Sequence, residues 1–211
     1  MGERSMKSVL LTPGGSGMAV TAIKALKQQS DIKTVATDID ELSAGLHLAD
    51  TGYLVPPFDD SEYMSAILDI VSSEDIDVVI PALDPILKRF SKVRNQFAEQ
   101  GAKVMVSNPE TLAITQDKWR TYRHLVGTVP VPESWIELDD IPNDEEYFVK
   151  PREGSGSEET YHATTLEELE FYFERVEDPI VQTYLPGKEF TIDCLTYSDG
   201  SLLACVPRLR K

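Results

Sequence analysis

The chain has 211 residues, of which 41% are hydrophobic, enough to bury a core and to exclude wholesale disorder. Acidic residues outnumber basic ones by 36 to 20, and the net charge of −16 disfavours nucleic acid as a partner. No apolar run approaches the roughly 20 residues that span a bilayer, so we expect no membrane-spanning segment.

The two ends and the cysteines give three further expectations. Residues 1–5 look like a vector-derived remnant ahead of a natural start at Met6, and no signal-peptide segment follows. Cys194 and Cys205 form no disulfide or metal-binding pattern, so we expect a cytoplasmic protein. The sequence stops directly after an expected strand, at residues 207–211, which suggests a fragment or one half of a split protein.

The first half of the sequence alternates strand-like with helix-like segments. Apolar runs typical of buried strands lie at residues 9–11, 32–37, 53–55, 77–82 and 103–106. Apolar residues at helical spacing mark residues 18–28, 61–71 and 84–100. Short strands separated by helices indicate a parallel sheet with helices on both faces. Residues 6–108 are therefore predicted to form a Rossmann-like α/β domain.

The second half has an α+β pattern instead. We expect a helix over residues 109–125, a helix over residues 166–176 opened by a capping box of Thr165 and Glu168, and strands at 134–137, 147–150, 160–163 and 180–185. Residues 189–197 and 202–206 are expected to form a hairpin. The change of pattern places a domain boundary near residue 109.

Two features of the first half could bind a ligand. Gly14, Gly15, Ser16 and Gly17 follow a strand and precede a helix, so their N–H groups could hold an anion, although a tight turn is the alternative. The loop lacks the G-x-G-x-x-G spacing of dinucleotide-binding proteins, which disfavours a nicotinamide oxidoreductase. Asp84 follows the fourth strand, at the edge where open α/β sheets bind ligands, with helix capping as the alternative.

The second half holds two motifs that suit a nucleotide. In residues 147–157 (YFVKPREGSGS), Lys150 ends a strand and precedes a Gly/Ser loop, and a fixed cation beside flexible N–H donors suits a polyphosphate. A solvated hairpin with an incidental lysine is the alternative. Further on, the backbone of residues 183–185 could pair with an adenine edge, and Glu189 could accept hydrogen bonds from ribose hydroxyls.

The order of these motifs resembles the ATP-grasp superfamily, and within it proteins similar to the carbamoyl-phosphate synthase large subunit. The resemblance covers residues 6–211. It implies a pre-ATP-grasp domain at residues 6–108 and a first ATP-grasp subdomain at residues 109–185. It also implies that residues 186–211 are the opening hairpin of a second, incomplete subdomain.

The same resemblance implies an ATP site. It places two lysines at phosphate-binding positions, a glycine/serine loop over the triphosphate, three residues at adenine, an acid at ribose and an arginine near a further basic contact. The phosphate lysines are Lys118 and Lys150, and the loop is Gly154, Ser155, Gly156 and Ser157. The adenine residues are Gln182, Tyr184 and Leu185, the ribose acid is Glu189, and the arginine is Arg208.

One departure from the family concerns the metal. The family's magnesium ligands include a Glu-x-Asn segment, and no such segment occurs in these 211 residues. We therefore expect ATP and Mg²⁺ as cofactors, with the metal ligands in a C-terminal part beyond this sequence.

The resemblance predicts the ATP-binding part of a ligase that activates a carboxylate as an acylphosphate for attack by an amine. This chain alone is expected to be inactive. The expected partners are the small-molecule carboxylate and amine substrates, and a homodimer or partner chain that completes the site. The alternative is a non-catalytic nucleotide- or metabolite-binding half of a split protein.

Overall fold

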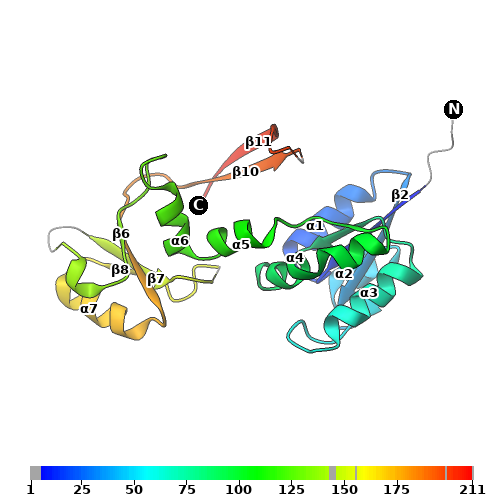
Figure 1. The fold of residues 1–211 in the computed structure, drawn as a ribbon, viewed down its shortest axis with the longest axis horizontal. Coiled ribbons are helices and arrows are strands. Elements are labelled where there is room, and N and C mark those ends of the chain that lie inside the picture. Colours follow the sequence, from blue (N-terminus) through cyan, green and yellow to red (C-terminus); the bar gives the residue numbers. More distant parts are fainter. Residues whose placement is uncertain (1–5, 143–145, 155, 198, 211) are drawn as a thin grey trace. The chain divides into compact units, whose positions relative to one another are not determined.

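The computed structural model describes residues 6–142, 146–154, 156–197 and 199–210 (Figure 1). The vector-derived remnant predicted at residues 1–5 lies outside these ranges. The chain divides into two compact units, Met1–Thr121 and Tyr122–Lys211, while the finer domain limits expected from the sequence stay predictions. Within the described ranges, every helix is too short or too polar to cross a bilayer.

The first unit is built on a five-stranded sheet with the order β3-β2-β1-β4-β5. All neighbouring strands are parallel, as predicted, and the apolar runs of β1 and β2 are buried almost throughout. The strands are β1 (Lys7–Thr12), β2 (Ile32–Asp38), β3 (Thr51–Leu54), β4 (Val78–Pro81) and β5 (Lys103–Val104).

Helices cover both faces of this sheet, which confirms the predicted α/β architecture. Leu10 of β1 joins a core with Ile67 of α3 and Phe90 of α4. The next residue, Leu11, points to the opposite face and packs with Ile23 of α1. The helices of this unit are α1 (Gly17–Leu26), α2 (Ala44–Leu48), α3 (Tyr63–Ser73), α4 (Asp84–Glu99) and α5 (Pro109–Thr115), with α6 (Lys118–Leu125) beginning at its end.

The prediction of one helix over residues 109–125 is wrong, because α5 and α6 are separate helices. The Asp117 side chain accepts hydrogen bonds from the N–H groups of Trp119 and Arg120, at 2.9 and 3.1 Å. A carboxylate in this position caps a new helix and breaks the preceding one. Lys118 is therefore the first residue of α6 rather than an interior helical residue.

The second unit holds a four-stranded sheet with the order β6-β9-β7-β8, all antiparallel. Its strands are β6 (Ser134–Trp135), β7 (Tyr147–Pro151), β8 (Tyr161–Ala163) and β9 (Pro179–Thr183). Helix α7 (Leu166–Arg175) packs on one face, where Leu169 meets Tyr147, Val149 and Val181. A short 3-10 helix, η1 (Leu138–Asp140), precedes β7.

The predicted capping box opens α7 with one change. The N–H of Glu168 donates to the Thr165 hydroxyl at 3.2 Å, as expected. The Glu168 carboxylate reaches one residue further back and accepts from both the N–H and the hydroxyl of Thr164. These hydrogen bonds lower the pKa of Glu168 below its ordinary value.

The predicted hairpin is present as β10 (Phe190–Thr196) and β11 (Leu202–Leu209), and β11 runs further than expected. Every residue of both strands is exposed in this chain. Beyond the strands, the N–H of Arg210 donates to the carbonyl of Glu189 at 2.9 Å, so the pairing extends by one more residue pair.

Gly45 of α2 lies against the loop between β1 and α1. A Cβ added to Gly45 would lie 2.1 Å from the carbonyl oxygen of Gly14, whereas a Cβ on Gly17 would meet no atom within 4 Å. We therefore predict that Gly45→Ala lowers the free energy of unfolding by about 1–3 kcal/mol, the range for overpacking.

Urea denaturation followed by circular dichroism measures this effect. Gly17→Ala is the matched control, and its free energy of unfolding should stay within about 0.5 kcal/mol of the unchanged chain. Equal stability of the two variants would contradict the close approach of α2 to the loop.

Candidate functional site

Strand β7 divides its side chains between the two faces of its sheet. Tyr147 and Val149 are buried against α7, so the alternating residues Phe148 and Lys150 point to the opposite face. The strand register pairs Phe148 with His162 and with Gln182, and Lys150 with Ile180. We call the face formed by Phe148, Lys150, His162, Ile180 and Gln182 the Lys150 face.

An aromatic cluster stands at one end of the Lys150 face. The rings of His162 and Tyr184 are stacked, with centroids 4.3 Å apart and planes 29° apart. Phe148 meets both rings, at 5.4 Å from His162 and 5.3 Å from Tyr184. The cluster joins β7 and β8 to the segment that follows β9.

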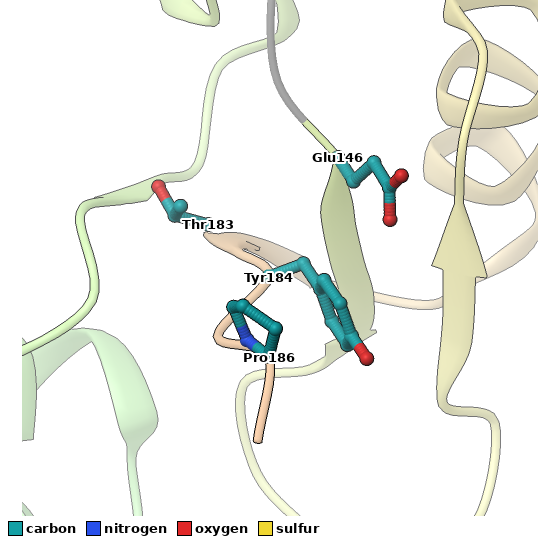
Figure 2. Close-up of a pocket in the computed structure, with 4 residues that line it drawn as sticks. All are labelled: Glu146, Thr183, Tyr184 and Pro186. Carbon is teal, nitrogen blue, oxygen red and sulfur yellow. The ribbon is translucent and has the colours of Figure 1, made fainter.

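A pocket of about 430 Å³ adjoins this cluster and is lined by Glu146, Thr183, Tyr184 and Pro186. Figure 2 shows the Glu146 carboxylate and the Tyr184 ring on one side of the strand end, and the Thr183 side chain on the other. The pocket thus lies where β9 leaves the sheet, beside the residues that the sequence assigned to adenine.

Two backbone N–H groups at the pocket already donate hydrogen bonds within the unit. The N–H of Thr183 donates to the Glu133 carbonyl at 3.0 Å, and the N–H of Tyr184 donates to the Glu146 carbonyl at 2.8 Å. The N–H groups of Thr183 and Tyr184, two of the backbone groups predicted for a base edge, are therefore already used within the fold. The Gln182 side chain donates to the Ser134 hydroxyl at 2.8 Å, which fixes its orientation.

The two lysines expected at phosphate lie in different units. Lys150 ends β7 on the same face as Phe148 and Gln182 and is half-buried. Lys118 is also half-buried, at the first residue of α6, and belongs to the first unit. The structure therefore brings Lys150, Gln182 and Tyr184 together within one unit.

The loop after β7 has backbone conformations that favour glycine. Gly154 and Gly156 have φ angles of +123° and +75°, and Ser157 has a φ of +61°. Ser155, which the sequence also assigned to the loop, lies outside the described residues. Turns that contain such residues are the backbone type in which anion-binding concavities occur.

Sequence reasoning missed Arg210, which joins two of the predicted site residues. Its guanidinium donates to the Glu189 carboxylate at 2.7 Å and to the Ser157 hydroxyl at 3.2 Å. Arg208, the arginine chosen from the sequence, instead pairs with Asp193 and lowers the pKa of that carboxyl. Arg208 and Arg210 share one face of the hairpin by their spacing, and that spacing is the signal that could have identified Arg210.

The loop between β1 and α1 donates a hydrogen bond to a carboxylate of the chain itself, that of Asp38. The N–H of Gly15 and the hydroxyl of Ser43 both donate to the buried Asp38 carboxylate, at 2.7 and 2.9 Å. Ser16 caps α1 by accepting from the N–H of Ala19, and the N–H of Gly14 donates to a β2 carbonyl. These contacts favour the tight-turn interpretation of residues 14–17.

Asp84 is exposed at the first residue of α4. Leu83 occupies the N-cap position, so the capping role expected as the alternative for Asp84 is not seen. The backbone carbonyl of Asp84 accepts a hydrogen bond from the Gln116 side chain at 2.9 Å. In the described ranges, no three His, Cys, Asp or Glu side chains come together as a metal site would require.

Two family models match the chain. Residues 9–105 match the PylC-like N-terminal domain, and residues 115–210 match the ATP-grasp domain. Among curated proteins, a carbamoyl-phosphate synthase of Methanobrevibacter smithii is 26% identical over 181 residues, which are 81% of this chain and 48% of that protein. The chain thus spans about half the length of the curated relative it matches.

Solved structures share the fold. An ADP complex of N5-carboxyaminoimidazole ribonucleotide synthetase aligns with a TM-score of 0.72 and 15% identity, over 98% of this chain and 55% of that one. The biotin carboxylase domain of the Hydrogenobacter thermophilus 2-oxoglutarate carboxylase, in complex with MgADP, aligns with a TM-score of 0.66 and 18% identity. That alignment covers 89% of this chain and 46% of the carboxylase chain.

The role of Asp38 in the first unit can be tested directly. In Asp38→Ala both accepting oxygens are removed, so the N–H of Gly15 loses its partner. We predict that hydrogen exchange of the Gly15 amide, followed by NMR, accelerates about tenfold or more. Asp40→Ala, at an exposed carboxylate two residues away, is the control and should leave that exchange rate unchanged. An unchanged rate in Asp38→Ala would contradict this account of the loop.

Proposed function

Because residues 9–105 of this chain are a PylC-like N-terminal domain and residues 115–210 an ATP-grasp domain, we propose that the chain supplies the ATP-binding part of a carboxylate–amine ligase. The observation that carries the proposal is the Lys150 face, where strand β7 has the aromatic pocket at its start and Lys150 with the glycine-rich loop at its end. The proposed reaction activates a carboxylate as an acylphosphate, which an amine then attacks.

The phosphates of ATP are assigned to Lys150 and the loop that follows it. In a chain of net charge −16, a polyphosphate needs local cations and N–H donors to offset the surrounding repulsion. The Lys150 ammonium is proposed to supply the cation, and the backbone N–H groups of Gly154, Gly156 and Ser157 are proposed as the donors. Lys118, the other lysine that the resemblance places at phosphate, belongs to the first unit and stays a prediction.

The base is assigned to the pocket at the end of β9. Its volume of about 430 Å³ falls in the range of small-molecule sites, and the Tyr184 ring gives it an apolar wall. The N–H of Leu185 is proposed to donate to a ring nitrogen of adenine, and a carbonyl of residues 183–184 to accept from the exocyclic amine. These are the groups that the fold leaves for base recognition, since the N–H groups of Thr183 and Tyr184 are taken.

The ribose is assigned to Glu189. Arg210 donates to one oxygen of its carboxylate, and the second oxygen is proposed to accept a hydrogen bond from a ribose hydroxyl. Since Arg210 also contacts Ser157 of the loop, it is a better candidate than Arg208 for the additional basic contact with the phosphates.

The described residues do not by themselves form a magnesium site, because no three candidate ligands come together in them. The proposal for these residues is therefore limited to binding ATP, orienting its phosphates and shielding them from water. The prediction that the metal ligands lie beyond residue 211 stays a prediction.

Isothermal titration of the chain with ATP tests the proposal. Lys150→Ala should weaken ATP binding about tenfold or more, because a hydrogen bond to a charged phosphate is lost. Lys24→Ala removes the same charge from the exposed side of α1 and should leave the affinity unchanged. Equal affinities of the two variants, or no saturable binding of ATP by the unchanged chain, would contradict the proposal.

A further inference from the structure

Glu146 holds Tyr184 through two of its own groups. Its backbone carbonyl accepts the Tyr184 N–H at 2.8 Å. Its carboxylate accepts a hydrogen bond from Nε2 of His162 at 2.9 Å, and the His162 ring stacks on the Tyr184 ring. Each of Glu146, His162 and Tyr184 thus contacts the other two, and these contacts fix both the backbone and the side chain of Tyr184.

These three residues lie at the pocket rather than in the core of the unit. Glu146 and Tyr184 line the pocket, and the side chains of Glu146 and His162 are 53% and 37% exposed. An exposed pair of this kind contributes little to folding stability. The buried side of the sheet is packed by other residues, with Tyr147, Val149 and Val181 against α7.

Fixing the Tyr184 ring has a consequence for a base that enters the pocket. A ring that is already held loses little conformational freedom on binding, so more of the contact free energy appears as affinity. Aromatic pairs contribute about 0.5–1.5 kcal/mol beyond the area they bury, but only when the ring planes are suitably oriented.

We propose that His162 is a positioning residue for the base of a purine nucleotide: with Glu146, it holds the Tyr184 ring as the wall of the base pocket. The inference rests on the proposed function and adds to it a residue that touches no part of the nucleotide. It separates base recognition, which depends on His162, from phosphate binding, which depends on Lys150.

Two ligands distinguish these roles in isothermal titration. ADP carries a base and phosphates, whereas inorganic tripolyphosphate carries phosphates alone. His162→Ala should weaken ADP binding about three- to tenfold, the equivalent of one aromatic contact, and leave tripolyphosphate affinity unchanged. Lys150→Ala should weaken the binding of both ligands.

Two further variants separate positioning from a general effect of the substitution. His162→Phe keeps a ring against Tyr184 but loses the hydrogen bond to Glu146, so it should recover part of the lost ADP affinity. His124→Ala, at an exposed histidine of α6, is the matched control and should change neither affinity.

The outcomes separate this inference from the proposed function. ADP affinity that His162→Ala leaves unchanged, or an equal loss for ADP and tripolyphosphate, overturns the positioning role alone. The same holds if His162→Phe binds ADP no better than His162→Ala. If the unchanged chain binds neither ligand, or Lys150→Ala binds both as well as the unchanged chain, the proposed function fails and this inference fails with it.

Discussion

The pairing of β7 with β9 is the constraint on which the candidate site depends. Because side chains alternate along a strand, the burial of Tyr147 and Val149 against α7 forces Phe148 and Lys150 to the other face. The same register places Gln182 opposite Phe148, and the strand end after Gln182 forms the pocket. A shift of one residue would turn Lys150 toward the apolar core, so the packing of α7 specifies the site.

Much of this architecture could be predicted from short-range patterns. The apolar runs of β1 and β2 predicted buried parallel strands, and the Thr165–Glu168 spacing predicted the start of α7. Lys150 could be predicted as a site residue because a lysine between an apolar strand and a glycine-rich loop is a local sequence pattern. Asp117 shows the limit of periodicity, since one capping carboxylate divided the expected helix into α5 and α6.

Contacts between distant segments could not be predicted in the same way. The pair of Arg210 with Glu189 depends on the register of β10 and β11, and that of His162 with Glu146 on the register of β7 and β8. The loop between β1 and α1 was predicted as a possible anion site. The anion to which its Gly15 N–H donates is the carboxylate of Asp38, 23 residues further along the chain. Patterns identify residue types for a function, whereas strand pairing decides which residues meet.

Mapping amide chemical shifts by NMR during titration with ADP shows whether the nucleotide binds at the Lys150 face. We predict that the largest changes occur at Phe148, Lys150, Gly156 and Leu185, on the Lys150 face, the loop that follows it and the pocket. We expect no comparable change in the loop between β1 and α1, where the N–H of Gly15 donates to Asp38. Changes confined to the loop between β1 and α1, with the Lys150 face unaffected, would contradict the account.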